Sequence, residues 1–586
     1  MKLEIRIGLG SCGVASGGEA VRAAIEAAAR EAGVEGVVKT VGCNGLCHRE
    51  PMVEVVNGKG TRVYGNLTAE TARAVALSHL KPRSVVTRAR WTLAKKADTA
   101  SNLFDGTPYL GRQKRIVLEN CGEIDPLNID DYLARDGYRA LRACRDTMTP
   151  AAVIDAILGS GLRGRGGAGF PTGRKWAIGR SQPGDTKYVI CNGDEGDPGA
   201  FMDRAVLESD PHRVLEGLAI AAYAIGASEG FLYIRAEYPM AVRHVRAAIA
   251  AATERGLLGG LRLEVREGAG AFVCGEETAL IRSLEGGRGM PKLRPPYPVE
   301  SGFRGCPTVI NNVETLACIP WILRNGPDAF AALGTETSKG TKVFALAGNI
   351  NRGGLIEVPM GITIRQVVEE IGGGIKDGRT FKAVQLGGPS GGCIPATLAD
   401  TAVDYDALAR TGAIMGSGGM VVLDDRTCMV DIARFFLRFT QAESCGKCTF
   451  CRIGTKRMLE VLERLCEGKG REGDLEKLEE LADYVSRGSL CGLGQTAPNP
   501  VLTTLRYFRE EYEAHLKEHR CPAGRCAALI RYSINQNCIG CTLCAQACPT
   551  GAIRYTPYEQ HTIEDSLCTR CDMCRQACQD DAVEVA

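Results

Sequence analysis

Eight cysteines near the end of the chain fall in two runs with the same spacing, C-x2-C-x2-C-x3-C. In this spacing the first three thiolates of a run bind one [4Fe–4S] cube, and the fourth thiolate binds the cube of the other run. The sequence therefore predicts two cubes with crossed ligands. The first set is Cys538, Cys541, Cys544 and Cys578, and the second is Cys568, Cys571, Cys574 and Cys548.

A third cluster is predicted from Cys445-x2-Cys448-x2-Cys451, with Cys491 as a fourth ligand beyond an amphipathic stretch. Three thiolates on one tight turn and a remote fourth thiolate suit a [4Fe–4S] cube. Structural zinc sites take their four ligands from paired loops. The spacing therefore favours iron.

Among the potential metal ligands outside these three sets, we group Cys466, Cys521, Cys526 and His561. Three cysteines and one histidine can form a closed tetrahedral zinc site. We therefore predict a zinc site that attaches the last cysteine-rich segment to the helices before it. The alternative, unrelated buried thiols and a surface histidine, stays open at this point.

The stretch 161–176 is rich in glycine and carries Arg163, Arg165, Arg174 and Lys175. Glycines allow consecutive backbone N–H groups to face an anion, and the cationic side chains add charge-assisted donors. This pattern predicts a phosphate-binding loop. A helix is expected over 151–158, where a dinucleotide fingerprint would follow a strand, and no Gly-Lys-Ser/Thr follows as in a P-loop. A basic surface loop is the alternative.

Composition limits the remaining possibilities. The 586 residues predict several domains, and the net charge of +2 gives no sign of a nucleic-acid surface. No apolar run approaches the ~20 residues of a transmembrane helix, and residues 1–7 alternate like a strand rather than a signal peptide. We therefore expect a cytoplasmic protein without direct membrane insertion. In such a protein the 26 cysteines indicate metal or iron–sulfur sites rather than disulfides.

The elements that would position the glycine-rich stretch are strands at 188–191, 230–234 and 262–265 that alternate with helices. This alternation predicts an α/β sandwich. Asn192, Asp194 and Glu195 follow the first strand, where polar side chains at a carboxyl end can bind a ligand. By themselves they could equally be a solvated turn.

The glycine-rich stretch resembles the flavin loop of the NADH-oxidising subunit of respiratory complex I. It also resembles the matching subunits of soluble NAD-linked hydrogenases and formate dehydrogenases. The resemblance continues through segments 191–199, 274–280 and 311–315. It implies a flavoprotein that transfers electrons between NAD(H), FMN and iron–sulfur clusters, and it lowers the weight of the surface-loop alternative.

The resemblance implies two sets of binding residues. The FMN set is Gly164, Arg165, Gly166, Gly167, Lys175, Asn192, Asp194, Glu195, Phe272, Gly275, Glu276, Glu277, Asn311, Asn312 and Thr315. The NADH set is Phe170, Glu277, Arg294 and Tyr297. No side chain is assigned as a catalytic acid or base, because the flavin itself takes the hydride.

Residues 1–80 predict strands at 3–8, 37–41 and 53–56 with helices at 18–32 and 68–79, an order that resembles thioredoxin-like [2Fe–2S] domains. Those domains carry four cysteines, whereas this chain offers Cys12, Cys43 and Cys47. Gly17 stands where a fourth thiolate is expected, and Ser16 is a candidate oxygen ligand. A [2Fe–2S] cluster with an unusual fourth ligand and a metal-free fold are both kept as interpretations.

The predicted fold is therefore multidomain, mixed α/β and α+β. We expect a thioredoxin-like domain at 1–80, a linker at 81–115, a Rossmann-like FMN and NADH domain at 116–335 and a ubiquitin-like β-grasp domain at 336–415. A helical [4Fe–4S] domain at 416–526 and a two-cluster ferredoxin at 527–586 follow. The turn at 387–392 is interpreted as structural.

The combination resembles the flavin subunit of electron-bifurcating [FeFe] hydrogenases and NAD-dependent formate dehydrogenases. The expected cofactors are FMN, NAD(H) and three [4Fe–4S] clusters, with the [2Fe–2S] cluster and zinc as further candidates. The resemblance implies a hetero-oligomer with a catalytic hydrogenase or formate dehydrogenase chain, a small thioredoxin-like [2Fe–2S] subunit and ferredoxin. Two alternatives remain: a flavin subunit that feeds a membrane quinone reductase, and an electron-transfer scaffold without NADH activity.

Overall fold

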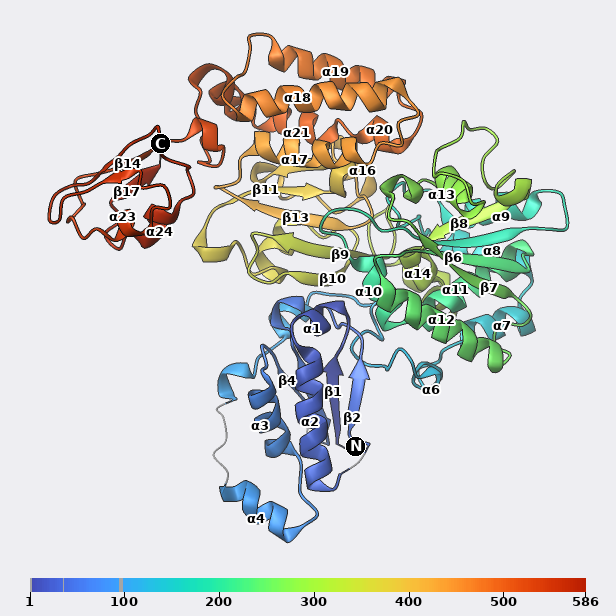
Figure 1. The fold of residues 1–586 in the computed structure, drawn as a ribbon. Coiled ribbons are helices and arrows are strands. Elements are labelled where there is room, and N and C mark those ends of the chain that lie inside the picture. The colour runs from blue at the N-terminus through green and yellow to red at the C-terminus, as the bar shows by residue number, and fades with distance from the viewer. Residues whose placement is uncertain (1–2, 35, 59, 94–98, 586) are drawn as a thin grey trace. The chain divides into compact units, whose positions relative to one another are not determined.

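The computed structural model describes residues 3–34, 36–58, 60–93 and 99–585 (Figure 1). Contacts divide the chain into two compact units. Unit 1 comprises Met1–Arg379 and Ala383–Val422, and unit 2 comprises Thr380–Lys382 and Leu423–Ala586. Both units combine helices with small sheets, so the predicted mixed, multidomain architecture is confirmed at this level.

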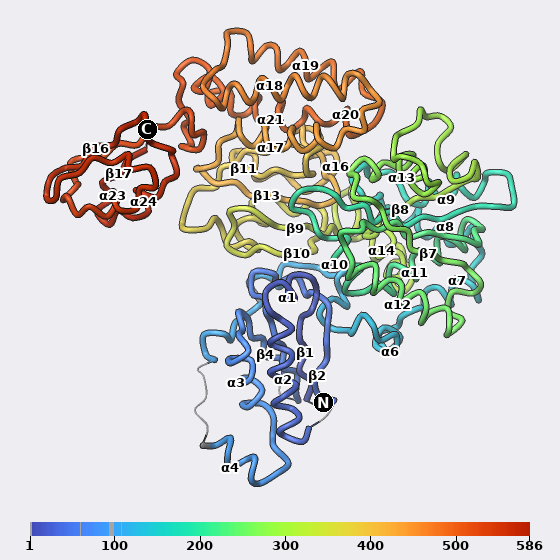
Figure 2. Tube along the Cα trace, in the orientation of Figure 1, coloured from blue at the N-terminus to red at the C-terminus, as the bar shows by residue number. Residues whose placement is uncertain are grey.

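The first domain of unit 1 has a four-stranded sheet in the order β2-β1-β3-β4. Strand β1 (Glu4–Gly8) pairs in parallel with β2 (Val38–Val41) and antiparallel with β3 (Val53–Asn57), which in turn pairs with β4 (Gly60–Tyr64). Helices α2 (Gly18–Ala32) and α3 (Ala69–His79) lie against each other beside the sheet (Figure 2). These strands and helices were predicted, apart from β4 and the short α1 (Ser11–Ala15).

The segment predicted as an irregular linker contains helix α4 (Val85–Leu93) and the short α5 (Thr107–Leu110). The expectation of irregular structure is therefore corrected in these two ranges, while the role of 81–115 as a linker stays a prediction. Residues 94–98 lie outside the described part. Beyond this segment, the buried Glu357 carboxylate accepts hydrogen bonds from the backbone N–H groups of residues 116–118.

The central sheet of unit 1 is parallel, in the order β7-β6-β5-β8. Its strands are β5 (Tyr188–Gly193), β6 (Glu229–Arg235), β7 (Arg262–Gly268) and β8 (Thr308–Asn312). Helices α8 (Pro150–Gly159), α9 (Thr172–Ser181), α10 (Met202–Ser209), α11 (Pro211–Ile225), α12 (Pro239–Glu254) and α14 (Val313–Asn325) surround it (Figure 1). The start of β5 is fully buried, as expected for a parallel strand covered on both faces.

A second sheet has five strands in the order β10-β9-β13-β11-β12. They are β9 (Thr341–Gly348), β10 (Gly354–Pro359), β11 (Phe381–Leu386), β12 (Gly392–Pro395) and β13 (Gly419–Asp424). Only the first two were predicted. The helix expected over 363–371 contains a π-helical segment, Gln366–Ile371.

Unit 2 contains a layer of helices followed by two small two-stranded antiparallel sheets. The helices include α17 (Met429–Ala442), α18 (Thr455–Cys466), α19 (Asp474–Gly488), α20 (Gly492–Thr496) and α21 (Asn499–Tyr507). Strand β14 (Tyr532–Ile534) pairs with β17 (Val583–Val585), and β15 (Ile553–Arg554) pairs with β16 (Thr562–Ile563). Helices α23 (Leu543–Ala547) and α24 (Met573–Ala577) lie within the two cysteine runs.

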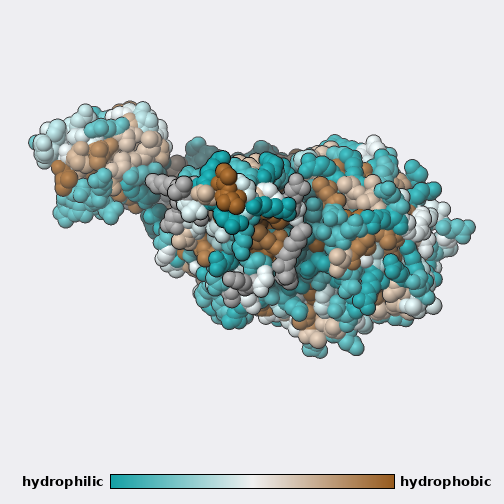
Figure 3. All heavy atoms as spheres, turned by 90° about the horizontal axis from the view of Figure 1, so that it is seen from below, coloured by the Kyte–Doolittle hydropathy of each residue, from teal (hydrophilic) through white to brown (hydrophobic). Residues whose placement is uncertain are grey.

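The surface visible in Figure 3 intersperses hydrophilic side chains with small hydrophobic patches. This mixture is ordinary for folded proteins. None of the helices in the described ranges has both the length and the apolar character needed to cross a bilayer.

Candidate functional site

The glycine-rich stretch forms a tight loop between α8 and α9. The predicted helix before it is confirmed as α8, and α9 begins at Thr172 directly after Pro171. Gly167 has φ of 117°, and a Cβ at this position would lie 3.2 Å from the backbone of Gly416. The loop therefore needs glycine both for its conformation and for the close approach.

Arg165 is fully buried and holds this loop in place. Its guanidinium donates to the backbone carbonyls of Arg163, Lys339 and Thr341 at 2.6–3.1 Å, and its N–H donates to Thr315 Oγ1 at 2.8 Å. The guanidinium is thus occupied by the protein. This corrects the expectation that it grips a phosphate, and we assign Arg165 a positioning role.

The other predicted flavin residues gather where the strands of the parallel sheet end. Asn192 lies at the end of β5, and its Nδ2 donates to the carbonyl of Gly275 at 3.0 Å; directly after the strand, Asp194 forms an ion pair with Arg235 at 3.4 Å. Glu195 is buried and accepts from the backbone N–H groups of Asp203 and Arg204 at the start of α10. The hydrogen bond of Asn192 therefore joins the end of β5 to the segment that follows β7.

The segment after β7 supplies Phe272, Gly275, Glu276 and Glu277, with a 3-10 turn (Phe272–Gly275) leading into α13 (Glu277–Leu284). Glu276 caps α13 by accepting from two backbone N–H groups. Glu277 forms an ion pair with Lys175 of α9 at 2.5 Å, and Lys175 also donates to the carbonyl of Ile310.

At the end of β8, Asn311 Oδ1 accepts from Trp176 Nε1 at 2.9 Å. Asn312 Oδ1 caps α14, and its Nδ2 donates to Asp203 at 2.6 Å. Gly166 lies against Asn312, since an added Cβ there would be 3.2 Å from that side chain. The structure therefore brings the predicted flavin residues from four separate segments to one edge of the sheet.

Three buried carboxyl groups lie near this edge of the sheet: Glu195, Asp197 and Asp203. Burial raises the pKa values of Glu195 and Asp203, and the Glu195 charge raises the pKa of Asp203 further. Burial also raises the pKa of Asp197 to about 6, against a hydrogen bond from Ser417 and the charge of Arg235. Buried carboxyl groups favour their protonated, neutral form unless a nearby cation compensates the negative charge.

The residues predicted for NADH lie nearer the surface. Phe170 and Tyr297 are 42% and 49% exposed. The guanidinium of Arg174 lies 6.0 Å from the Phe170 ring, and Arg294 lies 6.0 Å from the Tyr297 ring and 3.9 Å from Glu276. Exposed aromatic and cationic side chains beside a buried polar edge can stack on and pair with a nucleotide.

The N-terminal thiols lie together on the side of their domain that contacts α10. Cys43 Sγ is 3.8 Å from Cys47 Sγ, and Cys12 is within hydrogen-bonding reach of Cys47. Ser16 is exposed at the end of α1. Glu50 is the buried oxygen group beside this turn, because a Cβ on Gly13 would lie 3.3 Å from its carboxylate, and burial raises its pKa to about 8.

Hydrogen bonds from two turns attach this domain to α10. The Cys43 N–H donates to Ser209 Oγ at 3.0 Å, and Ser11 donates to Glu208 through its hydroxyl and its N–H. The thiol-bearing turns and Glu195 therefore contact opposite ends of one helix.

In unit 2 the cysteines of each predicted cube are neighbours. Cys491 precedes α20, where the N–H of Leu490 donates to Cys448 Sγ at 3.3 Å, and an added Cβ on Gly494 would lie 3.0 Å from Cys451 Cβ. One pocket of the last domain is lined by Cys538, Cys541, Cys544 and Cys578. A second pocket is lined by Cys548, Cys568, Cys571 and Cys574.

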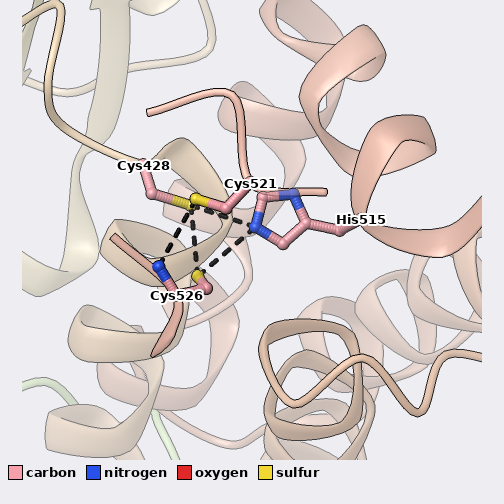
Figure 4. Close-up of side chains that lie close together, drawn as sticks. All are labelled: Cys428, His515, Cys521 and Cys526. Atoms are coloured by element: carbon pink, nitrogen blue, oxygen red, sulfur yellow. Dashed lines mark hydrogen bonds between the residues drawn. The ribbon is translucent and has the colours of Figure 1, made fainter. Parts of the chain in front are cut away.

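A separate set of ligands lies in the helical part of unit 2 (Figure 4). The side chains of Cys428, His515, Cys521 and Cys526 are buried, and their ligand atoms all lie within 4.8 Å of one another. His515 Nε2 is 3.4 Å from Cys428 Sγ and 3.3 Å from Cys526 Sγ, and these two sulfurs are 3.7 Å apart. Such a set can hold a metal ion with no open position.

The ligand set predicted from the sequence therefore needs correction. Cys521 and Cys526 belong to the compact set, but His561 lies against Cys544 at 3.3 Å, and Cys466 lies beside Cys526 outside the set. Cys428 and His515 were missed: Cys428 precedes Cys526 by 98 residues and meets it only through the tertiary fold, whereas His515 precedes Cys526 by only 11 residues. Of these, His515 could have been found from the H-x5-C-x4-C spacing.

Four segments of the chain match known protein families. Residues 157–321 match the Nuo51 FMN-binding domain, and residues 431–515 match the NADH-ubiquinone oxidoreductase-F iron-sulfur binding region. Residues 343–394 match an SLBB domain, and residues 537–582 match a 4Fe-4S dicluster domain.

Individual relatives extend the similarity to a larger part of the chain. The NADP-reducing hydrogenase subunit HndC of Solidesulfovibrio fructosivorans is 56% identical over 459 residues, which cover 77% of this chain and 93% of the relative. An NADH-quinone oxidoreductase subunit of Rhizobium meliloti (strain 1021) is 46% identical over 70% of this chain and 99% of its own length. A solved NAD+-reducing [NiFe]-hydrogenase in the H2-reduced state has a TM-score of 0.62 and 32% identity, covering 88% of this chain and 84% of its own. The chain therefore belongs to the family that unites these NADH-quinone oxidoreductase subunits with their hydrogenase counterparts, which are iron–sulfur flavoprotein oxidoreductases.

Proposed function

We propose that this chain is the NAD(P)H-binding, FMN-containing subunit of a hydrogenase-type complex and carries electrons between the nicotinamide and iron–sulfur clusters. The observation that supports this most is the convergence of the glycine-rich loop with the segments after β5, β7 and β8 at one edge of a parallel sheet. Ligands of open α/β sheets bind at such an edge. The relatives named as hydrogenase subunits favour a hydrogenase over a formate dehydrogenase or a quinone reductase as the catalytic partner.

The residues fit an FMN. Gly164, Gly166 and Gly167 carry no side chain that could separate the flavin from the backbone of this loop, whose N–H groups would face its phosphate. Lys175, Glu277 and Asn192 would face the ring system from the strand ends, with Asn312 and Thr315 on the phosphate side. When bound, FMN accepts two electrons from a nicotinamide and passes them on singly.

The chain's own contribution is to orient the two ring systems. Phe170 and Tyr297 would stack on the nucleotide, while Arg294 and Glu277 bind its polar groups. The ion pair between Lys175 and Glu277 holds both side chains in position. No side chain is required to move a proton in this step. The names of the relatives include both NAD and NADP, so the choice of nucleotide is an outcome of the test below.

For the clusters we propose the three [4Fe–4S] ligand sets predicted from spacing, because the cysteines of each set are neighbours. The N-terminal domain, for which we propose a thioredoxin-like fold, would hold a [2Fe–2S] cluster on Cys12, Cys43 and Cys47. Glu50 is the better candidate than Ser16 for the fourth ligand, since it is buried beside these turns. A β-grasp fold is proposed for the five-stranded sheet.

For the set around His515 we propose a structural zinc ion. A tetrahedral zinc with Zn–S of about 2.3 Å and Zn–N of about 2.0 Å separates two sulfurs by about 3.8 Å and a sulfur from a nitrogen by about 3.5 Å. The observed separations are 3.7 Å and 3.3–3.4 Å. His515 Nδ1 donates to the carbonyl of Glu511 at 2.7 Å, which leaves Nε2 free to bind the metal.

The test is anaerobic reduction of an artificial dye by the purified full chain, with NADH and NADPH compared by kcat/KM. We expect activity with at least one of them in protein that retains flavin. Cys491→Ser should keep dye reduction, because dyes can accept electrons from the flavin directly, and should lose reduction of ferredoxin. Flavin-loaded protein that oxidises neither nucleotide would refute the proposal and leave the scaffold alternative.

Purification from the native organism identifies the partners. Co-purification of a hydrogenase catalytic chain with a small [2Fe–2S] chain supports the hydrogenase complex. Co-purification of a formate dehydrogenase chain or of membrane quinone-reductase chains would replace it with one of those assemblies.

A further inference from the structure

The two pockets of the last domain are related by an internal repeat, and one residue breaks the symmetry. Tyr532 begins β14 ahead of the first cysteine run, and His561 lies directly before β16 ahead of the second run. Each ring is buried and lines the pocket of the opposite run: Tyr532 lies with Cys568, and His561 lies with Cys538. The two residues are therefore structural equivalents with different chemistry.

Their polar atoms are directed differently. His561 Nδ1 is 3.3 Å from Cys544 Sγ. The Tyr532 hydroxyl instead donates to Asp572 Oδ1 at 2.8 Å, so it has no hydrogen left for a sulfur. Thr550 Oγ1 lies 3.7 Å from Cys548 Sγ, but its hydrogen is donated to the carbonyl of Leu567 at 2.8 Å.

Backbone N–H donors to the cysteine sulfurs do not distinguish the two pockets. The N–H of Ala552 donates to Cys548 Sγ, and the N–H of Ala582 donates to Cys578 Sγ, each at 3.3 Å. The fourth thiolate of each run thus has an equivalent backbone bond. The imidazole of His561 is the side-chain contact that distinguishes the two pockets among the described residues.

The protonation of His561 follows from its surroundings. A cluster-bound thiolate can only accept a hydrogen bond, so the hydrogen of the neutral ring must lie on Nδ1. His561 Nε2 is buried and has no hydrogen-bond partner in the described part of the chain. A bare nitrogen there is less costly than a buried N–H without an acceptor, which favours the same tautomer.

We propose that His561 is a positioning residue that donates Nδ1–H to the Cys544 thiolate and holds the reduction potential of this cluster above that of its partner. The inference rests on the cluster sets proposed above. Hydrogen bonds to cluster sulfurs stabilise the more negative, reduced form. The cluster on Cys538, Cys541, Cys544 and Cys578 is therefore the first of the pair to take an electron.

The test is an EPR-monitored redox titration of the full chain at fixed pH. In His561→Phe, which keeps a ring but removes the donor, we expect the reduced-to-oxidised ratio of one cluster to fall about tenfold at a given potential, a shift of ~59 mV. The other cluster should not shift. His561→Asn places an amide N–H near the position of Nδ1 and should retain most of the wild-type potential. Tyr532→Phe is the matched control and should leave both potentials unchanged.

Two results would overturn the inference. Unchanged midpoints in His561→Phe would exclude the hydrogen bond as the source of asymmetry, and an equal shift in His561→Asn would assign the effect to packing. Iron and sulfide analysis with EPR spin counting is done first on wild-type protein. Absence of two clusters from this domain would refute the proposed cluster sets together with this inference, whereas intact clusters with unshifted potentials would refute only the role of His561.

Discussion

Replacing His515 by alanine should release zinc from the chain, whereas replacing Cys466 by serine should not. His515 is one of four ligands whose atoms lie within 4.8 Å of one another, and Cys466 lies outside that set. Structural zinc sites in small peptides bind with about 10–16 kcal/mol at pH 7. An equal share per ligand is about 2.5–4 kcal/mol, so the variant should bind zinc on the order of 10²–10³-fold more weakly.

The assay measures zinc and iron per chain by mass spectrometry after dialysis against a chelator that leaves wild-type zinc in place. We expect about one zinc per wild-type chain, a large loss in His515→Ala and Cys428→Ser, and retention in Cys466→Ser. Iron content should be unchanged in all of them, since the cluster cysteines are untouched. Zinc that survives in His515→Ala but is lost in Cys466→Ser would refute the structural ligand set and restore part of the one predicted from spacing.

Three further predictions concern unit 1. Arg165→Lys keeps the charge, but its single ammonium nitrogen cannot reach all three carbonyls that the separate guanidinium nitrogens reach. Apoprotein stability and FMN retention should therefore fall nearly as far as in Arg165→Met, and full retention in the lysine variant would indicate a simple charge contact instead. Gly167→Ala should add about 1–3 kcal/mol of local strain and weaken FMN binding, which is measured by fluorescence. Gly184 also has a positive φ but open space around it, so Gly184→Ala is the control and should leave FMN binding unchanged. Asp197→Asn tests pH dependence. A carboxyl whose pKa is raised from 3.8 to about 6 contributes about 3 kcal/mol less to folding stability at pH 6 than at pH 4. In denaturant titrations the variant should therefore gain stability relative to wild type over that window, and a stability difference that is constant with pH would contradict the assignment.

Features defined by neighbouring residues could be predicted from the sequence. Each cysteine run places three of the proposed cluster ligands within seven residues, and Glu195 and Asn312 lie at or just after the ends of strands whose burial is evident from their apolar letters. Features defined by the tertiary fold could not. Cys428 joins Cys526 only because α17 and the segment after His515 pack together, and the guanidinium of Arg165 turns inward because carbonyls of a distant loop lie within its reach.

The contacts of α10 have a consequence for how fast electrons can move. Glu195, at the proposed flavin edge, accepts hydrogen bonds from N–H groups at the start of α10. The last two residues of α10, Glu208 and Ser209, bind the turns that contain Ser11 and Cys43. An eight-residue helix is about 12 Å long. Because tunnelling rates fall exponentially with distance, a helix held by hydrogen bonds at both ends would keep electron exchange between the proposed flavin and the proposed N-terminal cluster constant while the rest of the domain fluctuates.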